Sequence, residues 1–511
     1  MAENGVRLAE LLTALSLAID IGLGLPMQTM QRAALVATRL AAASGATPDE
    51  AAAAFRLALL RFIGCTSTSH NDSVLFGGDE LAVAELMSMD DEEAPAVIER
   101  VVGAGKPPAE RAEATARFFG AVASGALAEG HRLHCEAARI IAGRVGLGPL
   151  VALSLDHIYE RWDGRGSLGL AGEAISMPMR IVHVATLAAQ ASAGTAPAEM
   201  AARVAARGGR QFDPRLAAIF ADEASAMLEG LDAPDLGAEV LAAEPGQPER
   251  LRDEALDRAL AAAADFGDFK SPHMLGHSRR VAALAEAAAR AASMPAGDIA
   301  LLRRAALVHD VGRVGVQAQL LSKPGPLTPA EHERIRLHPY LTERIFAASP
   351  ALQPVGALGA LHHERMDGSG YHRGLGAPAL SANARLLAAA NAWCALTEPH
   401  PHRPRLSEPE AARALAAEAS SGRLDGKAVD AVLTAAGQRP ASVRRAAGIG
   451  LSAREIEVLR LVCRQHTNRQ VAAALGISAK TVEHHVTHIY DKLGVATRAG
   501  AALYATENGL L

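Results

Sequence analysis

One stretch constrains the fold more than any other: residues 301–315, LLRRAALVHDVGRVG, in which an apolar helical run ends on His309 and Asp310. A helix that buries the run 305–308 and then presents an imidazole beside a carboxylate fixes two metal ligands at one rigid point. Gly312 and Gly315 then break the helix. A bare His-Asp pair is more often only the polar end of a helix, so the surrounding histidines decide between the two interpretations.

Further histidines lie near this stretch in the sequence. His273 and His277 are four residues apart in a helical segment, which predicts that they share one helix face. His338 and the adjacent His362 and His363 add three more nitrogen donors. Six histidines and one aspartate in such a pattern predict a site for a divalent metal.

Composition favours an all-α protein of about three domains. The chain has 511 residues, of which 50% are hydrophobic and only 3% aromatic, and it lacks long β-branched runs. No uncharged apolar run of about 18 residues is present, so we expect no membrane association and a cytoplasmic location. The four cysteines are scattered without a C-x-x-C motif, which argues against a disulfide framework and a zinc-thiolate site.

Charge is distributed unevenly along the chain. Residues 439–511 hold ten Lys/Arg against five Asp/Glu, a balance of +5, which leaves −10 on residues 1–438 from the total of −5. The C-terminal segment is therefore the part suited to bind a polyanion.

Residues 1–245 and 246–438 contain two copies of one plan, the first copy and the second copy. Thirty-two positions separate His277 from His309, and the same number separates Thr29 from Arg61. The motif at 364–370, ERMDGSG, has its counterpart at 160–166, ERWDGRG. We expect the two copies to pack against each other as a pseudo-dimer.

The copies differ at the predicted ligand positions. Five of these positions carry other residues in the first copy: Thr29, Arg61, Phe62, Ile158 and Tyr159 stand for His277, His309, Asp310, His362 and His363. Only His338 keeps a histidine, His134, at the same distance of 24 residues before the next motif. The first copy is therefore interpreted as a scaffold or sensor without a metal site of its own.

The second copy resembles the HD-GYP family of HD-superfamily phosphohydrolases over roughly residues 265–438. The motifs that carry the resemblance are HDVGR at 309–313, LSKPGPLT at 321–328, RLHP at 336–339 and HHERMDGSGY at 362–371. The resemblance implies an α-helical bundle that binds two or three iron or manganese ions and hydrolyses cyclic di-GMP. The first copy resembles a degenerate member of the same family.

The resemblance also assigns roles to residues. If the site is active, the catalytic residues are His309, Asp310 and Arg313. The metal ligands are His277, His309, Asp310, His338, His362 and His363, with His273 and Asn391 as further candidates. The substrate loop comprises Asp367, Gly368, Gly370 and Tyr371.

Three departures from the family leave enzymatic activity open. Arg313 stands where the family has lysine, and it holds phosphate but cannot give up a proton near neutral pH. Asn391 replaces an aspartate ligand with a neutral amide. His372 replaces the proline of the family's Gly-Tyr-Pro motif. A further and milder change is that His273 stands where multi-metal members carry glutamate, since imidazole is itself a metal ligand.

The C-terminal segment predicts a helix-turn-helix domain. Ser452 and Glu455 form a capping box before one helix, Thr467 caps a second, and Ser478 caps a third after the turn at Gly476. Residues 450–511 resemble the LuxR-type (NarL-like) DNA-binding domain, in the motifs LSARE, TNR, ISAKTV, HV and KLGV. By this resemblance Lys480, Thr481, His484 and Thr487 approach bases or backbone, and Asn468, Arg469, Lys492 and Arg498 hold phosphates.

The expected organisation is two HD-like helical bundles in tandem, at 1–245 and 246–438, a linker at 439–449, and a small four-helix helix-turn-helix domain at 450–511. The leading hypothesis is a transcription regulator, dimeric on duplex DNA, in which the HD-type region senses a metal, a cyclic dinucleotide or another phosphorylated ligand. The rival is an active metal-dependent phosphodiesterase with a DNA-binding tail. A purely structural helical scaffold is the third interpretation.

Overall fold

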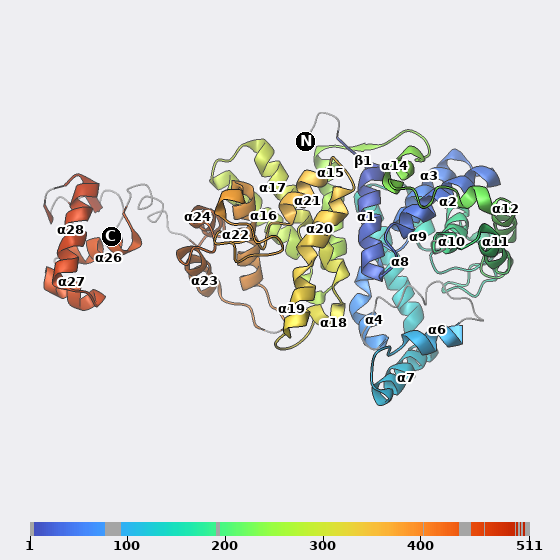
Figure 1. Cartoon of the computed structure of the whole chain (residues 1–511), viewed down its shortest axis with the longest axis horizontal. Coiled ribbons are helices and arrows are strands. Elements are labelled where there is room, and N and C mark those ends of the chain that lie inside the picture. The colour runs from blue at the N-terminus through green and yellow to red at the C-terminus, as the bar shows by residue number, and fades with distance from the viewer. Residues whose placement is uncertain are drawn as a thin grey trace. The chain divides into compact units, whose positions relative to one another are not determined.

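The structure is a computed structural model of the chain that describes residues 5–76, 94–190, 195–401, 403–438, 451–463, 466–495, 497–498, 501 and 504–505. These residues are mostly helical, which confirms the all-α expectation (Figure 1). The contacts divide the chain into two units, Met1–Val429 and Asp430–Leu511. The predicted linker at 439–449 lies outside the described residues. Across the described parts of the chain, each helix is too short or too polar to cross a lipid bilayer.

The first copy is a bundle of helices that begins with a two-residue strand. Its main elements are β1 (Val6–Arg7), α1 (Leu8–Leu23), α2 (Thr29–Ser44), α3 (Pro48–Leu60), η1 (Cys65–Ser67), α4 (Ser69–Leu75), α6 (Ala94–Val101), α7 (Pro108–Ser124), α8 (Ala126–Val145), α9 (Pro149–Leu155), α10 (Met177–Ala189), α11 (Pro197–Ala205), α12 (Pro214–Asp222), α13 (Ala224–Leu228) and α14 (Leu236–Ala242).

The second copy repeats much of this order. Its main elements are β2 (Arg250–Leu251), α15 (Asp253–Asp268), η4 (Pro272–Met274), α16 (His277–Ala291), α17 (Ala296–Val308), η5 (Val311–Gly315), α18 (Ala318–Leu321), α19 (Pro329–Arg336), α20 (His338–Ala347), α21 (Gln353–Gly359), η6 (Ala377–Ala379), α22 (Ala382–Thr397), α23 (Glu408–Ser420) and α24 (Gly426–Ala435).

Equivalent helices start and stop at equivalent residues. Both α2 and α16 follow a residue with left-handed backbone, Gln28 with φ 70° and Gly276 with φ 74°. Helix α3 ends immediately before Arg61, and α17 ends immediately before His309. The equal spacing in the sequence therefore reflects an equal sequence of helices in space.

A buried aspartate fixes the start of each of these helices. The Asp20 carboxylate accepts a hydrogen bond from the Met30 N–H at 3.2 Å, and the Asp268 carboxylate accepts one from the Ser278 N–H at 3.0 Å. A carboxylate at a helix N-terminus satisfies N–H groups that have no partner within the helix. In the second copy this contact holds His277, the first residue of α16, in place.

The two copies share an interface, as the pseudo-dimer expectation requires. Helix α1 packs on η5 of the second copy, α15 packs on η1 and α8 of the first copy, and β1 pairs antiparallel with β2. The approach between α1 and η5 is close, because a Cβ on Gly315 would lie 2.7 Å from the Cγ2 atom of Ile21. Equivalent elements thus meet each other reciprocally within one chain.

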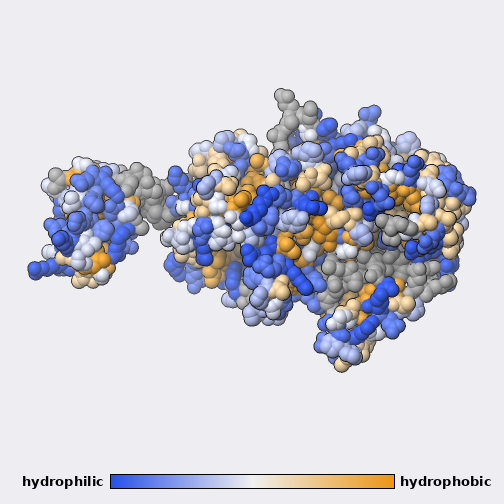
Figure 2. All heavy atoms as spheres, in the orientation of Figure 1, coloured by the Kyte–Doolittle hydropathy of each residue, from blue (hydrophilic) through white to orange (hydrophobic). Residues whose placement is uncertain are grey.

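The C-terminal unit contains the three predicted helices α26 (Ala453–Cys463), α27 (Asn468–Leu475) and α28 (Ala479–Leu493). Both bonds of the predicted capping box are present between Ser452 and Glu455. Val482, Ile489 and Leu493 of α28 are buried in the core of this unit, together with Ala501 and Ala505 from helical residues after position 497. The face of the unit visible in Figure 2 is mostly hydrophilic.

Two equivalent glycines allow the closest approach in the bundle. A Cβ on Gly64 would lie 2.1 Å from the carbonyl oxygen of His134, and a Cβ on Gly312 would lie 2.1 Å from that of His338. The expectation that Gly312 only breaks a helix was therefore incomplete. The glycine lets η5 touch α20 at the residue that carries a predicted ligand.

We predict that Gly64→Ala destabilises the first unit by about 1–3 kcal/mol, because a methyl group must push α8 away from η1. The thermal unfolding midpoint measures the effect without interference from a metal. Gly143→Ala is the matched control, since Gly143 lies within α8 and a Cβ there meets no atom within 4 Å. The control should be neutral or slightly stabilising. Equal midpoints for the Gly64 variant and the wild type would show that this contact is not tight.

Candidate metal centre and nucleic-acid interface

The apolar face of α17 positions the His-Asp pair. Leu302, Ala305 and Ala306 are fully buried, and the helix ends so that His309 and Asp310 enter the protein interior with exposed fractions of 0% and 1%. The Thr342 hydroxyl donates to the His309 carbonyl at 2.9 Å and accepts from the Gly312 N–H at 2.9 Å. The turn after α17 is therefore held from both sides.

Three imidazoles are oriented by their own backbones. The Nδ1 atoms of His309, His338 and His362 each lie 2.6 to 2.7 Å from the carbonyl oxygen three residues earlier. A neutral ring that donates from Nδ1 keeps its lone pair on Nε2, which is the arrangement of a metal-binding histidine. All three Nε2 atoms lie within 3.4 Å of Asp310 oxygens.

Asp310 stands between two groups of imidazoles. Its Oδ1 atom lies 3.2 Å from His338 Nε2 and 3.4 Å from His362 Nε2. Its Oδ2 atom lies 3.3 Å from His309 Nε2 and 3.6 Å from His277 Nε2. The carboxylate therefore lies within reach of histidines from both sides, and it would help these side chains to hold a metal ion.

The electrostatics of this centre favour a cation. Burial opposes ionisation of Asp310, but the Arg313 guanidinium and the His309 ring outweigh it and hold the pKa of the carboxyl well below its usual range. Burial lowers the pKa of His362 to about 3 and also lowers the pKa of His338. Asp310 is therefore ionised beside the His338 and His362 rings, which stay neutral. Burial opposes protonation of His309, but the Asp310 carboxylate outweighs it and raises the pKa of that ring, so a metal ion that binds His309 would displace its proton.

Unpartnered atoms test whether a metal fits. Both Asp310 oxygens and the Nε2 atoms of His309 and His363 are buried without a hydrogen-bond partner among the described residues. Ligand atoms of His277, His309 and Asp310 form one group that lies within 4.8 Å, and those of His338, His362 and His363 form another. Nitrogen and carboxylate donors at such distances suit a first-row transition metal such as iron or manganese.

The first group contacts one predicted candidate, Asn391, and one residue that the sequence interpretation missed, Glu398. The His277 ring contacts the Glu398 carboxylate through Nδ1 at 2.7 Å and the Asn391 amide oxygen through Nε2 at 3.0 Å. Arg280 holds the second Glu398 oxygen at 2.5 Å. Asn391 lies on α22, and Glu398, seven residues later, is the C-cap residue that follows this helix. The interval of seven, two helical turns, was the signal that could have identified Glu398.

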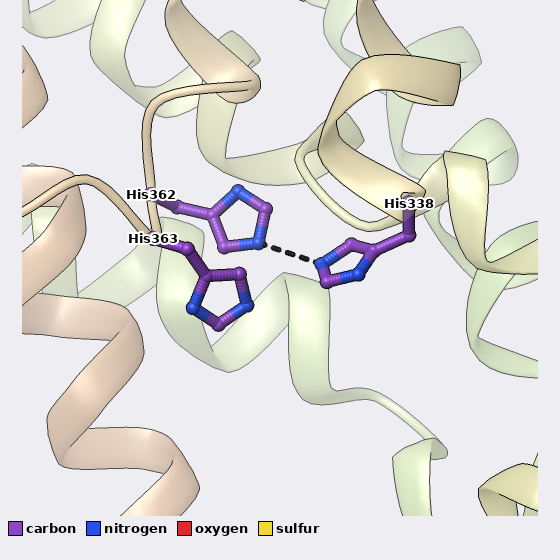
Figure 3. Close-up of side chains that lie close together, drawn as sticks. All are labelled: His338, His362 and His363. Atoms are coloured by element: carbon purple, nitrogen blue, oxygen red, sulfur yellow. Dashed lines mark hydrogen bonds between the residues drawn. The ribbon is translucent and has the colours of Figure 1, made fainter. Parts of the chain in front are cut away.

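The second group lies beside the predicted substrate loop. Figure 3 shows His338, His362 and His363 turned toward one another, with His338 Nε2 and His362 Nε2 3.0 Å apart. The Tyr371 ring stacks on His363 at 4.5 Å, and the Arg336 guanidinium lies 4.7 Å above the Tyr371 ring. Tyr371 thus connects the loop to the metal ligands.

The remaining loop residues serve the turn itself. The exposed Asp367 carboxylate accepts hydrogen bonds from the N–H and hydroxyl of Ser369. Gly368 has φ 79°, and a Cβ on Gly370 would lie 2.5 Å from Glu364 Cα. Arg313, the third of the predicted catalytic residues, lies with its Nε atom 2.9 Å from Asp310 Oδ2.

The prediction that His273 and His277 share a helix face was wrong. His273 lies in η4, whereas His277 begins α16, and Gly276 with its left-handed backbone separates the two elements. His273 is half-buried and is absent from both groups of potential ligands in the described residues. The other five predicted histidines come together as expected.

The equivalent place in the first copy is filled by internal contacts. Arg61, at the His309 position, donates to the Ile158 carbonyl at 3.2 Å and lies 4.9 Å above the Phe62 ring. The Tyr159 hydroxyl lies 2.7 Å from His134 Nδ1. Both groups of potential metal ligands in the described residues belong to the second copy.

The predicted DNA-contacting residues fall into two sets. Lys480, Thr481, His484 and Thr487 are exposed on α28, and Arg469 is exposed on α27. The others have partners within the unit. The Lys492 ammonium lies 2.8 Å from both Glu455 oxygens, and Arg498 donates to the His466 carbonyl at 2.6 Å and to the Asn468 side chain at 3.4 Å.

Comparison with known proteins identifies two families in separate parts of the chain. Residues 263–428 match the family described as "HD domain", and residues 450–505 match "Bacterial regulatory proteins, luxR family". The 3'3'-cGAMP-specific phosphodiesterase 3 of Vibrio cholerae is 28% identical over 410 residues, which are 79% of this chain and 89% of that protein. The transcriptional regulatory protein LiaR of Bacillus subtilis is 43% identical over 61 residues, or 12% of this chain and 29% of that protein.

A solved structure shares the helical architecture. The crystal structure of a cyclic GMP-AMP specific phosphodiesterase from V. cholerae matches with a TM-score of 0.57 and 25% identity, covering 85% of this chain and 99% of that one. The chain therefore carries an HD domain, whose relatives are HD-GYP phosphodiesterases, followed by a C-terminal helix-turn-helix domain of the LuxR family.

Proposed function

We propose that this protein is a DNA-binding transcription regulator in which the tandem HD region binds a divalent metal and a phosphorylated ligand and controls the LuxR-type head. The observation that carries the proposal is the presence, in one chain, of a centre of five histidines, four of them buried, and a LuxR-family domain with exposed polar side chains on α28, the predicted recognition helix. A head that reads DNA also supports the expected cytoplasmic location. Dimerisation on paired half-sites stays a prediction.

The metal would be held by two groups of side chains around one carboxylate. His277, His309 and Asp310 form the first group, with the Asn391 amide oxygen beside His277. His338, His362 and His363 form the second group. When bound, metal ions at such sites supply an activated hydroxide and neutralise phosphate charge.

The ligand would be a cyclic dinucleotide, because relatives of the HD domain are named as phosphodiesterases for such compounds. Arginine recognises phosphate through parallel N–H donors. Arg313 contacts the predicted ligand Asp310, and Arg336 lies over the ring of Tyr371, which in turn stacks on His363. Because a guanidinium keeps its proton near neutral pH, Arg313 would hold a phosphate and would not protonate a leaving oxygen.

The rival function, active phosphodiesterase with a DNA-binding tail, is favoured by the intact histidine groups. Asn391 argues against rapid turnover, because a neutral amide binds a hard cation more weakly than a carboxylate does. The two functions predict the same metal and the same ligand. They differ in whether the bound ligand is cleaved.

We predict that the purified chain retains iron or manganese and that His309→Ala loses most of it. Removal of this imidazole takes one ligand from the first group and leaves Asp310 without its contact at 3.3 Å. Metal content by elemental analysis is the measurement. His332→Ala, which changes an exposed histidine on α19, should keep the wild-type metal content. Equal metal content in both variants would contradict the assigned site.

We predict that Asn391→Asp increases metal affinity by about tenfold, because a carboxylate replaces an amide 3.0 Å from His277 Nε2. Titration of the metal-free protein with manganese measures this change. Cleavage of cyclic di-GMP and of 3'3'-cGAMP should be faster in the variant than in the wild type. Rapid cleavage by the wild type, abolished in His309→Ala, would establish the phosphodiesterase function instead.

We predict that Lys480→Ala weakens binding to DNA by about tenfold, or ~1.4 kcal/mol. The test is a mobility shift of the full chain on duplexes that it selects from a random library. Lys427→Ala removes an exposed lysine outside residues 450–505 and should leave affinity unchanged. If wild-type protein binds no duplex at low salt, the regulator proposal fails.

A further inference from the structure

The first copy contains a large cavity that the metal centre does not use. Its volume is about 760 Å³, and its lining comes from α1, α4, α7 and α8 together with Cys65 and Tyr159. Pockets that take small molecules have volumes of roughly 300–1,000 Å³. Apolar side chains such as Leu23, Phe76 and Phe118 form much of the wall.

The cavity lies next to the first copy's counterpart of the metal centre. Three of its lining residues, Cys65, His134 and Tyr159, occupy the positions of Arg313, His338 and His363 in the second copy. The equivalence is structural, because Gly64 touches the His134 carbonyl as Gly312 touches that of His338. Helices α4 and α7, which supply much of the wall, belong to a segment that is longer in the first copy.

The inner end of the cavity is polar but uncharged. Burial lowers the pKa of His134 to about 3 and that of His131 to about 4, so both rings are neutral. The His131 ring stacks on Tyr159 at 3.8 Å, and its Nδ1 atom lies 2.6 Å from the Ser167 hydroxyl. The charged lining residues Asp72, Arg117 and Glu129 include both signs. Because apolar side chains form much of the wall, burial of an anionic ligand there would have a large desolvation cost.

One buried atom at this end lacks a partner. His134 has an exposed fraction of 3%, and its Nδ1 atom already contacts the Tyr159 hydroxyl at 2.7 Å. Its Nε2 atom has no hydrogen-bond partner among the described residues. A buried polar atom without a partner costs about 1–3 kcal/mol, so a ligand that reaches it gains both this bond and apolar contact.

We propose that this cavity is an effector site for an uncharged, mostly apolar small molecule with one oxygen function, such as a ketone, ester or alcohol, that hydrogen-bonds His134 Nε2. The site is distinct from the metal centre and takes a ligand of opposite character to a cyclic dinucleotide. It gives the first copy, whose metal ligands are replaced, a sensory role of its own.

A pair of fluorescent probes tests the proposal without any DNA. N-phenyl-1-naphthylamine is neutral, and 8-anilino-1-naphthalenesulfonate has the same rings plus a sulfonate. The full chain should bind the neutral probe saturably at one equivalent, with at least tenfold lower affinity for the sulfonate. Because the measurement is probe fluorescence, a failure of the cavity proposal can be distinguished from a failure of the protein to bind DNA or metal.

Variants on one helix locate the probe. Ala121 lines the cavity, so Ala121→Phe should lower the affinity for the neutral probe at least tenfold. Ala123 is exposed and lies outside the lining, so Ala123→Phe should leave this affinity unchanged. Gly130→Leu is a second blocking variant, because Gly130 also lines the cavity. A Cβ at this position meets no atom within 4 Å, so the variant should fold normally. Non-saturable binding, equal affinity for both probes, or unchanged binding in both blocking variants would overturn the proposal.

Discussion

A single buried carboxylate organises the second copy. Asp310 is an ionised group in the protein interior, and a charge in such a place is tolerated only with compensating partners. Arg313 supplies one positive charge at 2.9 Å, yet the two oxygens also face the imidazole Nε2 atoms of His338 and His309. The Thr342 hydroxyl bonds the His309 carbonyl, and three of the histidine rings are bonded through Nδ1 to their own backbone. These contacts hold the imidazoles in fixed orientations around Asp310. The centre is therefore preorganised for a cation.

The first copy shows the opposite solution on the same scaffold. Arg61 brings a guanidinium to the His309 position, and burial lowers its pKa to about 10, which leaves it protonated at neutral pH. Phe62 stands where Asp310 would be, so the fixed cation has no carboxylate beside it at that position. A permanent positive charge repels a metal ion. The loss of ligands and the gain of arginine together explain why, among the described residues, both groups of potential metal ligands lie in the second copy.

The spacing of motifs in the sequence predicted the positions of residues on regular helices. It failed for residues whose positions depend on a loop or on a side-chain contact with another element. The interval of 32 residues identified both copies because a helix, a turn and a second helix fix that distance in each. It failed at His273, because Gly276 ends one element before α16 begins. Glu398 was missed because its role depends on a contact across the bundle with His277. The cavity was missed because apolar residues on α4, α7 and α8 form no motif until the helices pack.

In helix α28, an ion pair within the fold makes a charged residue less available to DNA than its sequence suggests. Lys492 resembles a phosphate contact in sequence, but its ammonium contacts both oxygens of Glu455, the residue that caps α26. Burial opposes ionisation of Glu455, yet Lys492 and the Ser452 cap lower its pKa to about 2. Glu455 and Lys492 therefore both stay charged, and their opposite charges nearly cancel. Glu483 on α28 subtracts further from the positive field. Besides the paired Lys492, among the residues with exposed side chains in the described part of this unit, Arg469 and Lys480 carry positive charge on the predicted DNA-binding helices. Because affinity for duplex DNA rises with the number of phosphates neutralised, we expect two heads on adjacent half-sites to bind better than one.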